Sequence, residues 1–588
     1  MSLSNLDWSI IGLFFLVSMG IGVYASRRAG QSTSEFFLSG RNMPWWLLGV
    51  SMVATTFSAD TPNLVTDIVR KDGVSGNWVW WAYLLTGMLT VFVYAKLWRR
   101  SEVMTDLEFY ELRYSGSIAK YLRIFRAIYL GVIFNVLVMS AVCLAAVKIG
   151  ATLLGLEPIQ TLLIASVITV IYSALGGLRG ILLTDFFQFI LAMIGTVWAA
   201  VVIVNLPMIG GLDRLLVHHN VVDKLDLIPS FSNTEAFVSL LIIPLAVQWW
   251  ASYYPGAEPG GGGYVAQRML AAKDEDHAIK ATLFFNIAHY ALRPWPWILI
   301  ALASLIVFPD FKSLEIAFPH LSKNVINDDL AYPAMLSYLP SGLLGLVIAS
   351  LLAAFMSTIS THLNWGASYV IHDVYRNLKE EEIEEKKLVL YARICTVVLM
   401  ILSAYVALNL ESAKSIFDLI VLMGAGTGLI YILRWFWWRI NAYSEIAAMV
   451  ISFVVALFFK TTGMFEGHIQ LVLGVLITTI GWVAVTYLTR PTSQTVLMSF
   501  YNKVKPHSVG WQKVISDGQA SGEIISSAET GSFINEFLCM LLGVIIVYSS
   551  LFGIGFFLYG QTIYALIGLI VVIVCSVLIS KQWHKVKI

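Results

Sequence analysis

The stretch that decides the fold reads Ala54-Thr55-Thr56-Phe57-Ser58-Ala59-Asp60-Thr61-Pro62, inside an apolar run over residues 45–69 that is long enough to cross a bilayer. A helix in lipid must satisfy every backbone N–H and C=O group, yet this run carries hydroxyl groups, a carboxylate and a proline at mid-depth. Pro62 removes one backbone donor and clashes with the carbonyl four residues earlier, so we expect the helix to open around residues 57–61. Freed carbonyls beside a buried acid would bind a cation; the alternative is a packing kink capped by Ser and Thr.

The composition places the whole chain in a membrane. Of its 588 residues, 58% are hydrophobic and only 13% are charged, whereas soluble domains carry about 25% charged residues. The rule of about 20 apolar residues per span predicts an all-α polytopic membrane protein with about 15 transmembrane helices. The expected spans are 7–26, 45–70, 77–98, 124–154, 158–175, 179–207, 234–254, 278–308, 341–375, 388–409, 413–438, 443–461, 467–488, 533–558 and 562–582.

The positions of the basic residues predict the orientation. If the N-terminus lies outside, most of the 38 Lys and Arg residues fall in segments that face the cytoplasm, as the positive-inside rule requires. We therefore expect a multi-pass protein of the cell (inner) membrane, with its N-terminus outside and its C-terminus in the cytoplasm.

A second interrupted helix is expected where residues 255–263 hold two prolines and five glycines, which cannot stay helical. A flexible linker is the alternative; the missing Lys-Ser/Thr after the glycines argues against a nucleotide loop. Each break opens a block of five expected helices, the sequence sign of an inverted-repeat transporter with its binding site at the breaks. The predicted units are an N-terminal helix and linker (1–43), a first five-helix repeat (44–209), a second repeat (210–442), two additional helices (443–489), a cytoplasmic, partly ordered loop (490–532) and two C-terminal helices (533–588).

Hydroxyl groups gather on one face of the span expected over 341–375. Ser357, Thr358, Ser360 and Thr361 are spaced by three and four residues, which places them side by side on a helix. Hydroxyl and carbonyl oxygens suit an alkali cation, and no thiolate or imidazole cluster indicates a transition metal. The alternative is that these hydroxyls only bond back to their own helix. Asp185, about one turn inside another span, is a functional candidate, with pairing to Arg179 as the alternative.

These residues resemble the sodium:solute symporter family, the relatives of sodium/galactose, proline and sialic acid transporters. The resemblance covers roughly residues 5–490. It is carried by the entry at 39–46, the break at 54–62, Gly176-Gly177 with Thr184-Asp185, the turn at 267–273, and the hydroxyl-rich span ending in Asp373-Val374-Tyr375. It implies a ten-helix core with the inverted-repeat fold of the bacterial leucine transporter.

The resemblance also implies the ion sites. A first sodium site is formed by the backbone carbonyls of Ala54, Phe57 and Ala354 with the hydroxyls of Ser357 and Thr358. Members with a second sodium site build it from the equivalents of Asp185, Ser357, Ser360 and Thr361, all of which bear oxygen here. We therefore expect two sodium ions per cycle, with no other metal and no organic cofactor.

The substrate residues are less defined by the resemblance. In sugar-transporting relatives an acid, an asparagine and a lysine hold hydroxyls; here those places are Trp80, the segment 249–263 and Tyr290, which argues against galactose-like recognition. Aromatic walls suit a sugar face or a quaternary ammonium, although an interfacial belt is the alternative. The candidate substrate residues are Asp60, Thr61, Trp80, Tyr83, Trp249, Trp250, Tyr253 and Tyr290. We expect Arg293 to form an ion pair with Asp60 or Glu258, with a substrate carboxylate as the alternative partner.

Together these features predict a sodium-coupled symporter that imports a small polar organic solute by alternating access, a sugar or polyol before an amino acid or carboxylate. No nucleophile–base pair indicates an enzyme, and nothing indicates a nucleic-acid partner. A transporter-like sensor would need an output module, and the seven residues after Lys581 argue against that expectation. An ion channel would need a repeated pore-loop filter, and the sequence shows no such repeat. The oligomeric state is not predicted.

Overall fold

A computed structural model of the chain describes residues 3–319, 321, 326–379, 383–410, 420–422, 424–523 and 533–587. Regular structure within these ranges is helical, apart from one isolated bridge between Met43 and Ala272, so the all-α prediction is confirmed. The first fifteen helices are α1 (Asn5–Ala29), α2 (Thr33–Leu38), α3 (Trp45–Thr56), α4 (Thr61–Asp72), α5 (Trp78–Trp81), α6 (Leu84–Leu89), α7 (Ala95–Ser101), α8 (Phe109–Arg113), α9 (Ser117–Ile128), α10 (Asn135–Ile149), α11 (Pro158–Val204), α12 (Leu212–Val217), α13 (Thr234–Phe237), α14 (Trp249–Ala251) and α15 (Gly263–Ala271).

The remaining helices complete the bundle and add a C-terminal extension. They are α16 (Glu275–Ile287), α17 (Pro294–Val307), α18 (Phe311–Ala317), α19 (Ala331–Leu336), α20 (Leu343–Ser368), α21 (Arg376–Leu378), α22 (Glu385–Ala407), α24 (Gly428–Leu433), α25 (Ala442–Thr462), α26 (Gly467–Leu488), α27 (Gln494–Val504), α28 (Gln512–Ser521), α29 (Phe533–Leu558) and α30 (Thr562–Lys587).

Twelve helical segments in the described ranges are long and apolar enough to cross a membrane, so the count of about 15 is not confirmed. Three departures from the expected spans account for the difference. The span over 45–70 is divided between α3 and α4, each too short alone. The spans over 158–175 and 179–207 are joined as α11, and the span over 413–438 lies partly outside the described residues.

A glycine joins the two halves of the 47-residue helix α11. Gly177 has φ 54° and ψ −160°, a region that is essentially open to glycine alone. An added Cβ there would lie 2.8 Å from the carbonyl oxygen of Phe36. The kink therefore depends on a residue without a side chain.

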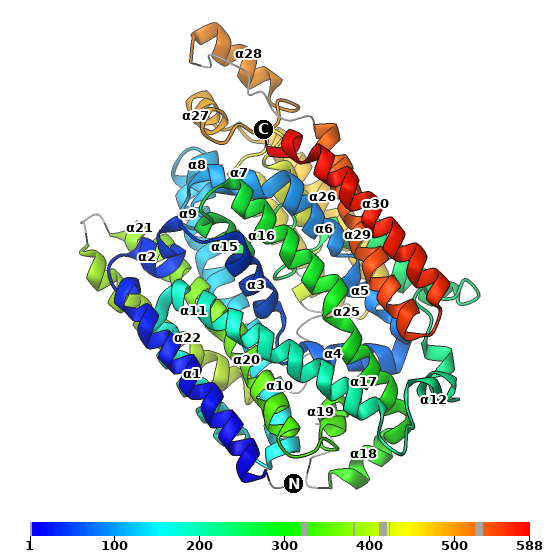
Figure 1. The fold of residues 1–588 in the computed structure, drawn as a ribbon. Helices are drawn as coiled ribbons and strands as arrows, with labels where there is room; N and C mark the ends of the chain where they lie inside the picture. Colours follow the sequence, from blue (N-terminus) through cyan, green and yellow to red (C-terminus); the bar gives the residue numbers. More distant parts are fainter. Residues whose placement is uncertain are drawn as a thin grey trace.

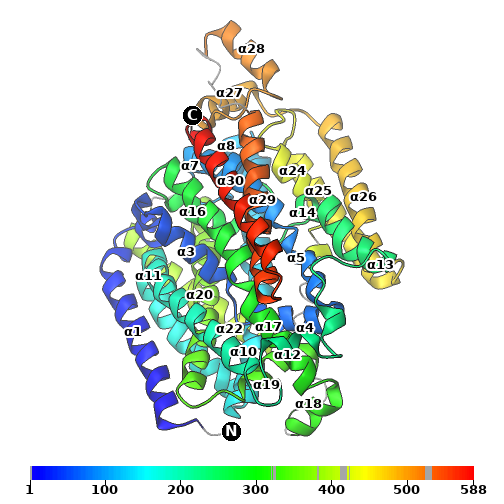
Figure 2. The same ribbon diagram turned by 45° about the vertical axis from the view of Figure 1, so that its right-hand side comes forward.

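The termini lie at opposite ends of the molecule, and α20 runs through its middle (Figures 1 and 2). α20 packs along α11, α3, α10 and α22, and nearly all of its residues are buried. α29 and α30 form a hairpin on one flank (Figure 1), where α29 contacts α6. Opposite termini suit an odd number of crossings, while the direction of insertion stays a prediction.

The segment after α26 is more ordered than its sequence indicates. Helices α27 and α28 lie at the end of the molecule that carries the C-terminus (Figure 1). The ring of Trp511 stacks on Phe500 at 5.5 Å between centroids, its Nε1 donates to the carbonyl of Trp435 at 2.9 Å, and the guanidinium of Arg113 lies 4.9 Å from its ring. Few apolar residues are needed because large aromatic rings provide the contact. Residues 524–532 of the predicted loop lie outside the described ranges.

Candidate functional site

The break that the sequence predicts around residues 57–61 is confirmed. Helix α3 ends at Thr56, and the N–H of Phe57 closes its last turn on the carbonyls of Val53 and Ala54, at 2.9 and 3.1 Å. Helix α4 begins at Thr61 with Pro62 in its first turn, where a missing N–H costs nothing. The intervening residues therefore leave the chain unwound in the middle of the bundle.

Helix α20 presents its hydroxyls to this break. The Thr358 hydroxyl donates to the carbonyl of Thr55 at 2.7 Å and lies 3.1 Å from the carbonyl of Ala354 on its own helix. Ser357 and Thr358 are both buried, at 1% and 3% exposure, so neither faces lipid. Thr358 and the carbonyl of Ala354 thus lie together at the break, while the carbonyl that Thr358 contacts belongs to Thr55, between the predicted ligands Ala54 and Phe57.

Asp185 lies at the centre of a neighbouring polar cluster. Its two carboxylate oxygens accept hydrogen bonds from Ser51 at 2.5 Å and from Ser357 at 2.6 Å. Ser360 donates back to the carbonyl of Ser357 on its own helix at 3.1 Å. Thr361 lies 2.9 Å from the Thr55 hydroxyl. Of the four predicted ligands of a second sodium, Asp185 and Ser357 contact each other directly, whereas the partner of the Ser360 hydroxyl is a carbonyl of its own helix.

A positive charge already lies in this cluster. Arg268 on α15, fully buried, donates to Thr361 at 2.7 Å and to Ser51 at 3.2 Å. Ser51 therefore links the guanidinium to the Asp185 carboxylate. In the described residues no carboxylate lies within 4.0 Å of Arg179. The alternative reading, in which Asp185 pairs with Arg179, is therefore wrong.

The second predicted break is also confirmed. Helix α14 ends at Ala251, and the chain does not resume a helix until Gly263 begins α15. The N–H of Gly263 donates to Asp106 at 2.9 Å, and Trp98 donates to the carbonyl of Gly260 at 2.9 Å. Gly260 has φ 78°, and a Cβ there would lie 2.7 Å from the Tyr431 carbonyl oxygen. The unwound segment is therefore packed closely against its neighbours.

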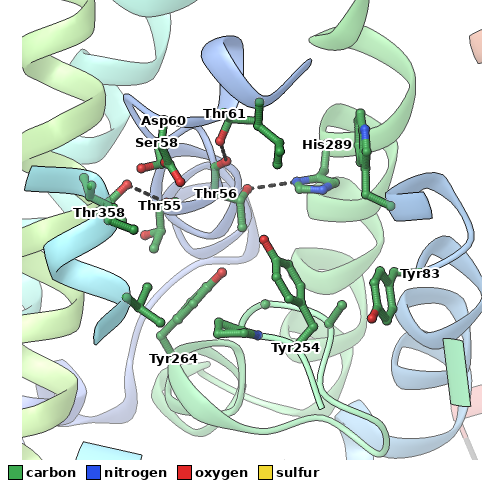
Figure 3. A pocket seen from close by; sticks show the side chains of 18 of the residues that line it. Thr55, Thr56, Ser58, Asp60, Thr61, Tyr83, Tyr254, Tyr264, His289 and Thr358 are labelled. Atoms are coloured by element: carbon green, nitrogen blue, oxygen red, sulfur yellow. Dashed lines mark hydrogen bonds between the residues drawn. The ribbon is translucent and has the colours of Figure 1, made fainter. Parts of the chain in front are cut away.

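A cavity of about 130 Å³ lies between the two breaks. In Figure 3 the polar residues at the end of α3 face Tyr254 and Tyr264, with His289 and Tyr83 to one side. Of the eight candidate substrate residues, five line this cavity: Asp60, Thr61, Trp80, Tyr83 and Tyr290. Thr55, Thr56 and Thr358 line it as well. The candidate ion site and the cavity therefore share a wall.

Three candidate substrate residues lie elsewhere. Trp249 and Trp250 donate their ring N–H groups to carbonyls one turn earlier, at 2.9 and 2.8 Å, and neither lines the cavity. Tyr253 packs against Phe134 and Tyr431 instead.

An interfacial belt, the alternative reading of the aromatic residues, does not describe those in the span expected over 77–98. These residues, Trp78, Trp80, Trp81 and Tyr83, are all at most 8% exposed, so they lie inside the protein rather than at a membrane edge.

Comparison with known proteins places this geometry in a family. The family model described as "Sodium:solute symporter family" matches residues 36–452, more than half of the chain and both breaks. The chain belongs to the sodium:solute symporter family. This confirms the resemblance found in the sequence, and it makes the protein a multi-pass membrane transporter rather than an enzyme.

Relatives of this symporter differ in the solutes they are named for. It is 26% identical over 476 residues to the sodium/glucose cotransporter of Vibrio parahaemolyticus, covering 78% of this chain and 86% of that one. It is 25% identical to the sodium/sialic acid symporter NanT of Aliivibrio fischeri, covering 83% and 94%. A solved substrate-bound, outward-open structure of a Na⁺-coupled sialic acid symporter has the same fold, with a TM-score of 0.69, 21% identity, and coverage of 84% and 99%.

Arg293 stands at the start of α17 in the cavity wall of the symporter, 2% exposed. It donates from Nε to the carbonyl of His289 at 3.2 Å and from Nη1 to the Thr56 hydroxyl at 3.3 Å, while Nη2 lies 3.2 Å from Nε2 of His289. The predicted ion pair is wrong: among the described residues no carboxylate, including those of Asp60 and Glu258, lies within 4.0 Å of this guanidinium. Arg293 stands at the start of α17, away from both acids in the sequence, and its guanidinium is held by His289 and Thr56 instead.

Several residues of the site were not among the candidates. They are Ser51, Thr55, Thr56, Ser58, Tyr254, Tyr264, Arg268 and His289. Two signals were present, because Thr55, Thr56 and Ser58 belong to the break at 54–62 and Arg268 to the turn at 267–273, and both motifs carry the family resemblance. The sequence does not show which way the remaining side chains point, since their orientation is set by the unwound backbone and by packing between distant helices.

Proposed function

We propose that this symporter imports a small polar organic solute together with sodium, by alternating access around its two helix breaks. The observation that supports this proposal is the shared wall: Thr55 and Thr358, which meet at the first break, also line the cavity. An ion that binds there draws α20 and the end of α3 together. The same movement changes the shape of the solute cavity, which couples the two binding events.

The first sodium site would use the oxygens already gathered at the break. Its ligands are the carbonyls of Ala54, Phe57 and Ala354 with the hydroxyls of Ser357 and Thr358. The donor set is all oxygen, which suits a hard cation. The contact of Thr358 with two carbonyls fits this arrangement. A sodium ion bound there would be coordinated by these carbonyls and by the oxygen of the hydroxyl, whose hydrogen would turn away from them.

We propose a second sodium ion at Asp185, with Ser357, Ser360 and Thr361 as its further ligands. The contact between Asp185 and Ser357 supports the site. The guanidinium of Arg268 lies in the same cluster and balances the charge of the carboxylate, so the proposed ion would have to bind to Asp185 beside this positive charge. Ser360 and Thr361 would have to rotate their hydroxyls toward the ion.

The stoichiometry decides how far the solute can be concentrated. Each sodium ion that crosses about 100 mV down a tenfold gradient supplies roughly 2.3 plus 1.4 kcal/mol. One ion then supports a solute ratio of roughly 500-fold, and two support roughly the square of that ratio.

The cavity wall suits a solute with both polar groups and an apolar face, such as a sugar or polyol. Trp80 stacks on Tyr290 at 5.8 Å and Tyr83 stacks on Tyr254 at 5.5 Å, so each pair is held rigid by its partner. Ring faces and hydroxyl groups at this spacing favour close packing around a small solute. An amino acid or another carboxylate is the second candidate, which the charge of Arg293 favours.

The experiment that tests the function is accumulation in proteoliposomes. Purified symporter is given an inward sodium gradient and a panel of radiolabelled solutes, with potassium replacing sodium as the control. We expect one class of solute to rise above its external concentration and to fall when a sodium ionophore is added. Binding without accumulation would instead indicate a sensor, and accumulation without sodium would overturn the coupling mechanism.

A further inference from the structure

Arg293 is a buried arginine that lines the cavity and has no carboxylate within 4.0 Å among the described residues, a lack that it shares with Arg113, Arg126 and Arg268, which do not line the cavity. Arg70, Arg123 and Arg434 each have a carboxylate nearby, at 2.8, 2.6 and 3.5 Å between nitrogen and oxygen. Among the described residues, the hydrogen-bond partners of Arg293 are a carbonyl, a hydroxyl and an imidazole nitrogen, and its guanidinium also lies 5.3 Å from the centroid of the Trp297 ring. A guanidinium within a membrane span is costly unless a negative group accompanies it, and its position in the cavity wall marks a functional site.

The hydrogen bonds of Arg293 leave part of its donor capacity open. A guanidinium has five N–H groups, and three of them are directed to His289 and Thr56. Two N–H groups, one on each terminal nitrogen, have no acceptor among the described residues. A carboxylate accepts two such N–H groups in parallel, which a single hydroxyl cannot do.

His289 and Thr56 hold the guanidinium in this position. One tautomer satisfies every contact: Nδ1–H of His289 donates to the Thr56 hydroxyl at 2.9 Å, and Nε2 accepts from Arg293 at 3.2 Å. The Thr56 hydroxyl in turn donates to the carbonyl of Val53 at 3.0 Å, inside α3. The side chain of Arg293 is therefore fixed to the end of the broken helix before any solute arrives.

Asp60 supplies the opposite charge on the same cavity. It lies in the unwound stretch between α3 and α4, and its Oδ1 atom is buried with no hydrogen-bond partner in the part of the chain that the structure describes. Because Asp60 and Arg293 are more than 4.0 Å apart, they do not neutralise each other by contact. A solute bound between them would accept hydrogen bonds from Arg293 at one end and donate to Asp60 at the other.

We infer that the transported solute carries a carboxylate group, which the Arg293 guanidinium binds, and a hydroxyl or ammonium group, which donates to Asp60. This inference rests on the proposed sodium-coupled transport, and it takes the second of the two candidate solute classes, the carboxylates, in place of neutral sugars and polyols. His289 is a positioning residue, since it acts by orienting the guanidinium. Polyhydroxylated acids and amino acids share this chemistry, whereas neutral sugars and polyols lack the carboxylate.

The test compares matched solutes with the full-length symporter in proteoliposomes. The probes are gluconate with glucose and sorbitol, and alanine with alaninamide, each measured for sodium-driven uptake. We expect uptake of at least one carboxylate and none of its neutral or amide counterpart. Gluconate and alanine separate the two sources of the carboxylate. Sodium-driven uptake of glucose or sorbitol alone would overturn the inference and leave the proposed function standing; no sodium-driven uptake at all would overturn both.

Variants of the wall locate the carboxylate. Arg293→Gln should raise the KM for the transported carboxylate about tenfold or more, because a charge-assisted hydrogen bond is lost; Arg293→Lys, which keeps the charge, should recover part of the loss. The KM of His289→Gln should be closer to the wild-type value than the KM of His289→Ala. Arg214→Gln, an exposed residue on α12, is the charge-matched control and should leave the KM unchanged.

Folding is checked separately by gel filtration and by the sodium dependence of tryptophan fluorescence. If Arg293→Gln does not fold, Arg293→Lys replaces it, since a point charge that cannot form the two-pronged contact should still raise the KM. An unchanged KM in a folded Arg293 variant would overturn the inference.

Discussion

The hydroxyl of Thr358 donates a 2.7 Å hydrogen bond to the carbonyl of Thr55, the next-to-last residue of α3. This contact joins two spans that are far apart in the sequence, at the place where one of them stops being a helix. A carbonyl inside an intact helix would be used by the N–H four residues later. The bond therefore exists because the break makes a carbonyl accessible to α20.

Removing this hydroxyl should weaken sodium binding. Thr358→Val keeps the shape of the side chain but loses the oxygen that contacts Thr55 and Ala354. We expect the sodium concentration for half-maximal uptake to rise about tenfold or more, with a cost in stability of only about 1 kcal/mol. The measurement is sodium-dependent uptake together with the melting temperature.

The matched control for this change is Thr396→Val on α22. Thr396 is equally buried and donates to the carbonyl of Ala392 on its own helix at 3.0 Å, away from the break. It should leave the sodium dependence unchanged. Equal sodium affinity in Thr358→Val and wild type would remove Thr358 from the ion site.

Asp185 decides the number of ions. Asp185→Asn removes the negative charge that a second sodium needs, so the Hill coefficient for sodium should fall toward one, as should the ratio of sodium to solute. Paired measurements of radioactive sodium and solute fluxes give this ratio directly. A sodium-steep transport curve that is unchanged in the variant would rule out the second site. Asp213→Asn, an exposed acid on α12, is the control.

Asp185 and Arg268 should also behave as a coupled pair in stability. Arg268 donates to the Ser51 hydroxyl, and this hydroxyl donates to Asp185, so losing one charge leaves the other buried without its counterpart. Asp185→Asn and Arg268→Gln should each lower the melting temperature, and the double variant should lose less than the sum of the two. Additive losses would show that the two side chains act independently.

The breaks were predictable because their cause is local. Pro62 stops a helix from continuing through it from the N-terminal side, and the prolines and glycines of 255–263 disfavour a helix there, so sequence alone locates the unwound segments. The hydroxyl face of α20 was predictable for a similar reason, since α20 is a regular helix through Ser357 and Thr358 and spacing fixes direction.

The cavity wall was not predictable in the same way. Tyr253 and Tyr254 are neighbours in an unwound segment, where helical periodicity cannot tell which of them faces the solute; Tyr254 does, and Tyr253 packs away from it. Arg268 reaches Thr361 from another helix, and no pattern within one span shows such a contact. These directions are set by tertiary packing.

The docked segment of α27 and α28 should depend on one indole. Trp511 is fully buried against Phe500 and Arg113, so Trp511→Ala should cost about 3–5 kcal/mol locally. We expect faster limited proteolysis between α26 and α29. Trp198→Ala, at a position on α11 that is 54% exposed, should leave the proteolysis rate unchanged. Equal rates in both variants would show that the segment does not depend on this contact.

Gly177 should be the least tolerant position of α11. Gly177→Ala forces an alanine to φ 54° and ψ −160°, at a cost of about 1–3 kcal/mol, and its Cβ would meet the Phe36 carbonyl at 2.8 Å. Three residues later, Gly180→Ala meets Ala25 at an ordinary 3.4 Å and gains about 1 kcal/mol of helix propensity. We therefore expect Gly177→Ala to lower the melting temperature of the purified protein and Gly180→Ala to keep or raise it. If both substitutions were tolerated equally, the two halves of α11 could be joined as a continuous helix, and the kink would not be a requirement of the fold.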